Sequence, residues 1–147
     1  MNDRVFVDTN ILIYARDDRF PEKQSAAVAW LETISRRETM AVNPQVIGEF
    51  CNAAGRRKLM PDDELRQTVL LLEPWSVGDI DLALIQAAWD LRVSTRYQWW
   101  DCMILAAAIS AGCRYLLSED MHHDRKVDSI TILDPFKVSP AAILTTR

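Results

Sequence analysis

Short apolar runs alternate along the chain with longer segments in which apolar residues recur every three or four positions. The short runs are rich in β-branched and aromatic side chains, which predicts short buried strands. These runs lie at residues 4–8, 39–43, 75–77, 114–117 and 130–133. The longer segments between them predict helices with one apolar face.

Start and stop signals set the limits of these helices. Thr9 or Asn10 can cap the first helix, and Gly112 suits the end of the last one. The predicted helices cover residues 11–14, 21–37, 44–58, 61–72, 79–93 and 100–112. The tail after Pro135 has no clear pattern.

The alternation of helices and strands predicts the fold class. Short apolar strands separated by helices indicate a short parallel sheet with helices on both faces, which is a three-layer α/β/α fold. No internal repeat, low-complexity tract or linker divides the chain. Residues 1–147 are therefore expected to form a single domain.

The five tryptophans divide into two groups. Trp30, Trp75 and Trp89 fit core positions in this pattern, and Trp89 shares the helix of residues 79–93 with other apolar side chains. Trp99 and Trp100 are adjacent at a helix start and must diverge. One of them can line a groove and stack on a base or a partner's side chain. The other interpretation is that both pack in the core or in a dimer interface.

Composition places the chain among soluble globular proteins, because 49% of residues are hydrophobic and 26% are charged. Three widely spaced cysteines match no disulfide or zinc pattern and are interpreted as small buried hydrophobes in a reducing compartment. The N-terminus lacks a secretory pattern, and the longest apolar run, residues 103–109, is too short for a membrane span. A cytoplasmic location without membrane contact is expected.

Charge adds a constraint on partners. The formal net charge is −4 and the sequence pI is about 5.1, so no broad basic face for nucleic acid is expected. Two basic clusters, residues 36–37 and 56–58, fall at predicted helix ends. Cations there complement the helix dipole, and they can equally contact phosphate. Composition alone does not indicate a nuclease.

Four carboxylates occupy positions that are unusual for surface charge. Asp8 ends the first predicted strand and Asp120 follows the strand at 114–117, at the sheet edge where ligand sites gather in parallel sheets. Glu49 lies at the border of an apolar helix stripe. Asp101 heads the stripe of its helix that should face the sheet, in the first turn, where the dipole favours an anion.

Each acid has an ordinary explanation when taken alone: a helix cap for Asp8, a dipole-stabilised residue for Asp101, a solvated rim position for Glu49. Together, converging carboxylates repel one another unless a positive charge neutralises them. No basic residue flanks any of them in sequence. A hard divalent cation such as Mg²⁺ or Mn²⁺ fits oxygen ligands and suits phosphodiester hydrolysis. The number of ions, one or two, stays open.

Four short motifs carry a family resemblance that covers residues 5–136. They are VFVDTN at 5–10, Glu49 in the helix after Asn43-Pro44-Gln45, Trp100-Asp101 before ILAAA, and LLSED at 116–120. In this order and spacing the chain resembles the PIN-domain nucleases, and within them the VapC-like toxins of toxin–antitoxin pairs.

The resemblance implies a Mg²⁺- or Mn²⁺-dependent endoribonuclease with Asp8, Glu49, Asp101 and Asp120 as its catalytic acids. Asp8, Asp101 and Asp120 are the implied metal ligands; Glu49 and Asp120 act directly or through water. Asn10 and Ser118, and less clearly Thr9, match positions that orient the acids. The implied partners are an RNA substrate, a cognate antitoxin that covers the acidic groove, and a second copy of the chain.

One segment departs from the family pattern. After Asp120, relatives often have a polar residue and then glycine, whereas this chain has His122-His123-Asp124. His123 is interpreted either as an extra ligand or base, or as an exposed loop residue. Glu119 either points away from the site or substitutes for Asp120.

Two other functions stay open from the sequence. The first is a PIN-like module that has lost catalysis and serves as a binding scaffold. The second is a phosphotransferase or phosphohydrolase with Asp8 as covalent nucleophile. That chemistry typically requires a second Asp two residues on, where this chain has Asn10, which cannot act as a general acid or base.

Overall fold

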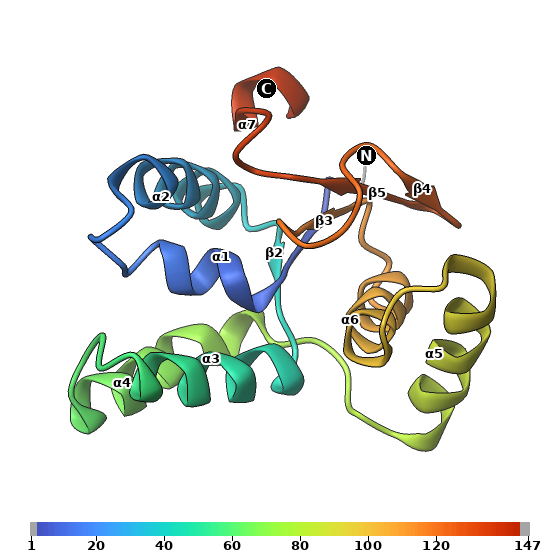
Figure 1. Ribbon diagram of the computed structural model, residues 1–147, viewed down its shortest axis with the longest axis horizontal. Helices are drawn as coiled ribbons and strands as arrows, with labels where there is room; N and C mark the ends of the chain where they lie inside the picture. Colours follow the sequence, from blue (N-terminus) through green and yellow to red (C-terminus); the bar gives the residue numbers. More distant parts are fainter. Residues whose placement is uncertain (1–2, 145–147) are drawn as a thin grey trace.

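The computed structural model describes residues 3–144. Its helices and strands alternate as the sequence predicts (Figure 1). The strands are β1 (Val5–Val7), β2 (Met40–Ala41), β3 (Tyr115–Leu117), β4 (Lys126–Val127) and β5 (Ile130–Leu133). The helices are α1 (Thr9–Tyr14), α2 (Pro21–Arg36), α3 (Pro44–Arg56), α4 (Asp62–Leu72), α5 (Leu82–Thr95), α6 (Trp99–Ser110) and α7 (Pro140–Ile143).

The strands form one sheet in the order β2-β1-β3-β5-β4. β2, β1, β3 and β5 are parallel, with Val7 opposite Leu117 in neighbouring strands. The predicted α/β/α fold is confirmed. The sheet is mixed rather than purely parallel, because β4 pairs antiparallel with β5. A two-residue strand is too short to leave a periodic signal in the sequence.

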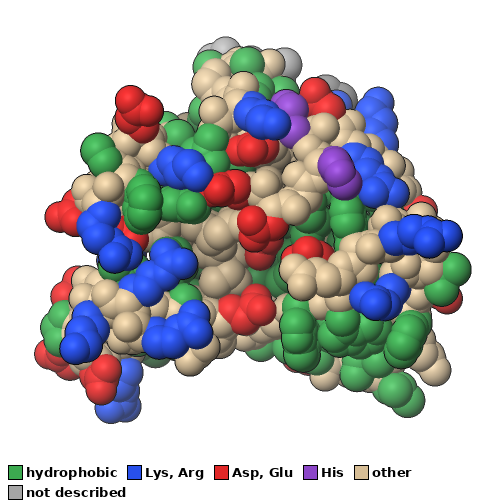
Figure 2. Space-filling view, viewed as in Figure 1, with side chains coloured by type: hydrophobic (Ala, Val, Ile, Leu, Met, Phe, Trp, Pro, Cys, Tyr) green, Lys and Arg blue, Asp and Glu red, His purple; other side chains and the backbone are tan. Residues whose placement is uncertain are grey.

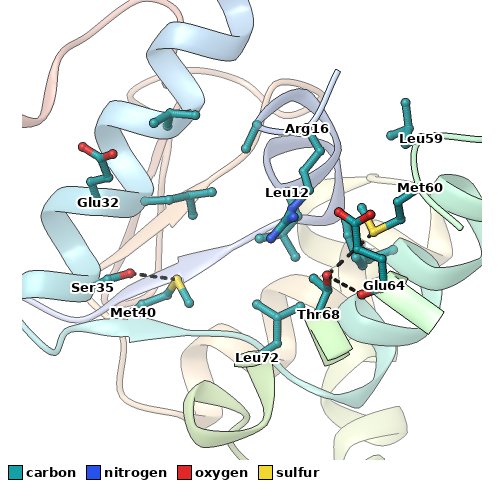
Figure 3. Close-up of a pocket in the computed structure, with 14 residues that line it drawn as sticks. Leu12, Arg16, Glu32, Ser35, Met40, Leu59, Met60, Glu64, Thr68 and Leu72 are labelled. Carbon is teal, nitrogen blue, oxygen red and sulfur yellow. Dashed lines mark hydrogen bonds between the residues drawn. The ribbon is translucent and has the colours of Figure 1, made fainter. Parts of the chain in front are cut away.

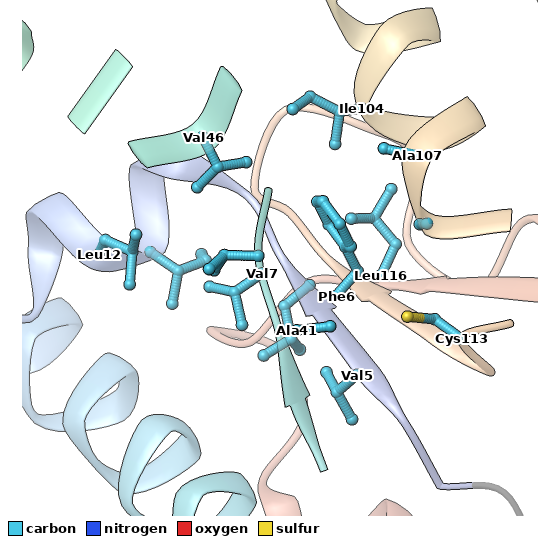
Figure 4. Packing of buried hydrophobic residues seen from close by; sticks show 14 of the residues in the cluster. Val5, Phe6, Val7, Leu12, Ala41, Val46, Ile104, Ala107, Cys113 and Leu116 are labelled. Atoms are coloured by element: carbon cyan, nitrogen blue, oxygen red, sulfur yellow. The ribbon is translucent and has the colours of Figure 1, made fainter. Parts of the chain in front are cut away.

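The core alternates across the sheet as the strand pleat requires. Phe6 and Leu116 lie toward Ile104 and Ala107 of α6, whereas Val7 lies toward Leu12 of α1 on the opposite face (Figure 4). All six of these side chains are buried, Leu12 and Ala107 slightly less completely than the others. The sheet therefore lies between α1, which begins directly after Asp8, and α6, which contains Asp101 in its first turn.

The predicted strand at residues 75–77 is wrong. Glu73–Trp75 forms a single 3-10 turn, and only an isolated parallel bridge joins Val42 to Ser76. Pro74 sits inside this turn and has no backbone N–H to donate to a strand ladder.

The prediction for α5 is wrong about the buried face. The helix is capped by Asp81 and begins at Leu82, three residues later than predicted. Leu84, Ala88 and Leu91 face inward, while Trp89 is 57% exposed instead of buried. Of the other two tryptophans assigned to the core, Trp30 is fully buried and Trp75 is half-buried.

The last described segment packs against α2. The segment after Pro135 forms the short α7, and the Trp30 indole donates a hydrogen bond to the Val138 carbonyl at 2.9 Å. Gly112 follows α6 with φ of 69°, as a residue closing a helix does. Cys102 and Cys113 are buried and Cys51 is half-buried, and all three are free thiols.

Two hollows lie on opposite sides of α1. The first, of about 400 Å³, opens between α1, α2, α3 and α4 and has mainly apolar walls, with Leu12, Met60 and Leu72 among its lining residues (Figure 3). The second lies beside the carboxyl edge of the sheet and contains the candidate acids. No helix among residues 3–144 is long and apolar enough to cross a membrane.

Candidate active site

The candidate site begins at the carboxyl ends of β1 and β3. Within the sheet, β2 lies on one side of β1, and β3 and β5 lie on its other side. Strand order reverses between β1 and β3, and α/β sheets bind ligands at such a switch point. Asp8 follows β1 and Ser118 follows β3, so the register places these two side chains next to each other.

Asp8 is buried, and each of its carboxylate oxygens accepts one hydrogen bond. Its Oδ1 accepts from the Thr9 backbone N–H at 2.7 Å, and its Oδ2 accepts from the Ser118 hydroxyl at 2.8 Å. Asp8 is thus the N-cap of α1, as its ordinary explanation from the sequence held, and the prediction of Thr9 or Asn10 as the cap is wrong. Burial raises the pKa of Asp8 to about 7; the Ser118 and Thr9 hydrogen bonds lower it, while repulsion from Asp101 and Glu49 raises it.

The first residues of α1 connect Asp8 to two further acids. The Thr9 hydroxyl donates to Glu49 Oε1 at 3.0 Å, so α1 is tied to α3. The Asn10 side-chain amide donates to Asp120 Oδ2 at 2.9 Å and ties α1 to the loop after β3. Glu49 is half-buried and Asp120 is exposed. Because these hydrogen bonds occupy one oxygen of each carboxylate, the other oxygen stays open for a ligand.

Asp101 enters the site from the first turn of α6. Gln98, three residues earlier, donates a hydrogen bond to Asp101 Oδ2 at 3.2 Å. Partial burial raises the pKa of Asp101, and repulsion from Asp120 and Glu49 adds to the increase, against the lowering effect of Gln98. Asp101 is therefore coupled electrostatically to each of the other three acids.

The four predicted acids line one groove of about 480 Å³. In the space-filling view, Asp and Glu side chains gather in the middle of this face, with Lys and Arg side chains on both sides of them (Figure 2). Within the described residues, none of the four acids forms an ion pair. The negative charge of the cluster is therefore left without a protein counter-ion.

The donor set fits a hard divalent cation. Four carboxylates offer oxygen ligands, and repulsion between them adds to the rise in pKa that burial causes at Asp8 and Asp101. Among residues 3–144, no three acidic, histidine or cysteine side chains already stand close enough to share one ion. Mg²⁺ is usually held by one or two carboxylates together with waters, so only direct coordination by three of these acids would require them to move closer.

Glu119 lines the same groove but is held at its border. Lys23 of α2 donates to Glu119 Oε1 at 2.8 Å, and the Tyr14 hydroxyl approaches the same oxygen at 3.5 Å. The second oxygen, Oε2, is buried and has no hydrogen-bond partner. Glu119 therefore does not point away from the site, and its substitution for Asp120 stays a prediction.

The histidines after Asp120 stabilise their loop and lie outside the groove. His123 Nδ1 accepts the backbone N–H of Asp134 at 2.9 Å, so neither interpretation from the sequence, ligand or exposed residue, describes it. His122 stacks on Tyr97 with ring centroids 5.8 Å apart. Asp124 adopts φ of 65°, a conformation that favours glycine and that Asp tolerates better than most residues.

The two adjacent tryptophans diverge as expected. Trp99 is half-buried and packs on Trp89 with ring centroids 5.1 Å apart. Trp100 is 58% exposed and lines the groove next to Asp101.

Two contributors to the site were not found from the sequence. Gln98 was detectable, since residues three apart on a helix are neighbours. Lys23 was not, because 96 residues separate it from Glu119 and only the folded chain brings them together.

The fold and the groove define an α/β/α domain with a carboxylate site at its topological switch point. The chain belongs to the PIN domain family, whose model matches residues 5–128. PIN domains are generally nucleases and typically use divalent metal ions.

Solved structures support the same fold. A toxin–antitoxin complex from Klebsiella pneumoniae aligns with a TM-score of 0.60 and 20% identity, over 89% of this chain and 97% of that one. VapBC2 from Rickettsia felis, bound to a DNA fragment from its promoter, aligns with a TM-score of 0.60 and 17% identity, over 87% and 96% of the two chains. A comparison with curated proteins gives no significant match.

Proposed function

We propose that the chain is a Mg²⁺- or Mn²⁺-dependent endoribonuclease that hydrolyses RNA phosphodiester bonds in this groove. One observation carries the proposal: four carboxylates from separate elements line one groove at the switch point without a protein counter-ion. Keeping such charges together costs free energy, and a bound cation offsets that cost. Membership of the PIN family supports nuclease chemistry.

The groove residues have different proposed roles according to where they lie. Asp8, Asp101 and Asp120 are the proposed metal ligands, and Glu49 completes the acidic set directly or through water. A bound divalent cation supplies a Lewis acid that polarises phosphate and lowers the pKa of an attacking water. The hydrogen bonds from Ser118, Thr9 and Asn10 fix the orientation of these acids.

The geometry argues against Asp8 as a covalent nucleophile. The side chain is only 7% exposed, and each of its oxygens already accepts a hydrogen bond. A nucleophilic carboxylate must reach the phosphorus itself, whereas a metal ion can bind the second lone pair of an oxygen that already accepts one hydrogen bond. Asn10 donates to Asp120 instead of assisting proton transfer at Asp8.

We further propose that this nuclease is the cytoplasmic toxin of a toxin–antitoxin pair. The two structural neighbours described above are toxin–antitoxin complexes, which supports a protein partner of this kind. An unpaired acidic groove is complementary to a basic side chain, so an antitoxin segment that carries one can cover the site.

A second copy of the chain is the proposed cover for the outer face of α5. Leu82, Trp89 and Val93 are 68%, 57% and 78% exposed there. Neighbouring exposed apolar side chains mark interaction surfaces. Light scattering of the purified chain, compared with Val93→Asp, tests this homodimer: a monomer in both samples would contradict it.

The nuclease is tested with purified protein and a structured RNA in Mg²⁺ or Mn²⁺. Cleavage is expected with either ion and not with EDTA. Asp101→Asn is expected to lose at least 100-fold in rate. The matched control is Asp90→Asn, an exposed acid of α5 outside the groove, which is expected to cleave normally.

A negative result in this assay would favour one of the two other functions. A folded protein that cleaves no RNA with any divalent ion contradicts the proposal and leaves the PIN-like scaffold as the function. A phosphorylated Asp8 would show covalent catalysis instead.

A further inference from the structure

We propose that the groove binds single-stranded RNA, with an unpaired base stacked on Trp100 and a neighbouring phosphate bound by Arg56 and Arg57. This inference rests on the proposed ribonuclease function and adds how the substrate is held. All three side chains line the groove that contains the four acids.

Trp100 offers an aromatic face immediately beside the acids. It precedes Asp101, and its side chain is 58% exposed although a tryptophan usually buries most of its surface. Its backbone is fixed, because the carbonyl of Trp100 accepts from the buried Gln45 side chain of α3 at 3.5 Å. A base stacks on such a face without sequence preference, provided that it is unpaired.

Trp99 is unsuited to this role. Its ring packs on Trp89, and it does not line the groove. The structure thus assigns different roles to two adjacent tryptophans: Trp99 joins α6 to α5, and Trp100 faces the site.

The basic end of the groove lies along α3. Arg56 is seven residues after Glu49, which places it on the same helix face and about 10 Å further along the axis. Arg56 is exposed and has no ion-pair partner in the described part of the chain. The helix dipole accounts for a cation at this end but not for its place in the groove wall.

Arg57 is more constrained than Arg56. It reaches the buried Asp17 at 4.0 Å, but Arg19 already binds Asp17 through two short side-chain hydrogen bonds of 2.9 and 2.7 Å. The long separation from Asp17 leaves the guanidinium of Arg57 able to bind a phosphate oxygen. Two cations here partly offset the negative charge that the acids present to RNA.

The test measures RNA affinity in an Asp101→Asn background, which prevents cleavage, in Mg²⁺. The probes are single-stranded 12-nucleotide oligo(A) and oligo(U), with a blunt RNA duplex of the same length for comparison. Trp100→Ala is expected to weaken single-strand binding about 5- to 150-fold. Trp100→Phe is expected to restore part of the affinity, and the duplex is expected to bind more weakly than either single strand.

Salt dependence separates stacking from charge. The double variant Arg56→Ala/Arg57→Ala is expected to reduce the slope of log Kd against log salt by about 0.7 for each phosphate that the arginines no longer neutralise. Trp100→Ala is expected to leave the slope unchanged. Leu71→Ala and Arg66→Ala, exposed residues of α4 away from the groove, are the matched controls.

The outcomes separate this inference from the proposed function. If the parent chain cleaves RNA but the Trp100 and arginine variants bind like their controls, the inference is overturned and the nuclease stands. Unchanged RNA affinity in Trp100→Ala would assign the ring to a protein partner. If the parent chain neither cleaves nor binds RNA, the proposed function and the inference fail together.

Discussion

The carboxylate groove and the outer face of α5 both face solvent, yet neither has the mixture of side chains that is usual on a protein surface. The groove exposes charges that repel one another, and the outer face exposes Leu82, Trp89 and Val93. Hydrogen bonds from α1, from Gln98 at the start of α6 and from Ser118 after β3 orient the groove acids, whereas the exposed side chains of the outer face are apolar and form no hydrogen bonds within the described residues. A surface whose exposure to solvent costs free energy therefore indicates where a cation or another chain is expected to bind.

The difference between the two faces of α5 gives the largest expected effect. Leu91→Ala removes a buried side chain and is expected to lower the free energy of unfolding by about 2–5 kcal/mol. Val93→Ala, two residues later on the outer face, is expected to change it by less than about 0.5 kcal/mol. Urea denaturation of the monomeric protein measures both. Equal losses of stability would mean that α5 is rotated from the orientation described above.

In the groove, the hydrogen bond from the Ser118 hydroxyl to Asp8 is expected to contribute most to stability. Ser118→Ala leaves Asp8 Oδ2 without its donor in a buried position, which is expected to cost about 1–3 kcal/mol of stability. Ser139→Ala removes a hydroxyl from an exposed cap of the short α7 and is the control, with a smaller expected cost. Thermal unfolding in EDTA compares them, and a stable Ser118→Ala protein would show that this hydrogen bond contributes little.

The raised pKa of Asp8 predicts how stability depends on pH in EDTA. The folded chain keeps the Asp8 proton up to about pH 7, while the unfolded chain releases it near 3.8. The folded state thus binds more protons between these values, and stability contributed by this group falls as pH rises. The slope approaches roughly 1 kcal/mol per pH unit. Asp8→Asn is expected to flatten it in denaturation curves from pH 5 to 8; an unchanged slope would contradict the burial of Asp8.

The last comparison concerns the ring of Trp89 on the outer face of α5. Trp89→Ala removes an exposed ring that contacts Trp99, so the decrease in monomer stability is expected to stay near about 1 kcal/mol. The same change is expected to weaken self-association measurably in sedimentation equilibrium. Unaltered self-association with lower stability would place the importance of Trp89 within the monomer.

The candidate site was predicted more completely than the helix packing. Asp8 and Asp120 were recognisable because strand ends adjoin in a parallel sheet, and Asp101 because it heads an apolar stripe. The outward face of α5 was not predictable, because its apolar residues surround the helix and periodicity cannot select one side. The antiparallel β4 was missed because two residues carry no pattern.

The sequence by itself determined the α/β/α alternation and the four acids, since both are local in the chain: each depends on a strand end or a helix stripe. Tertiary structure alone decided what holds those acids. The hydrogen bonds from Thr9 to Glu49, Asn10 to Asp120 and Lys23 to Glu119 join residues 40, 110 and 96 positions apart. Such interactions exist only after the sheet brings β1 and β3 together. A hydrogen bond requires a donor–acceptor distance of about 3 Å, and the spacing of two residues in the sequence does not specify that distance.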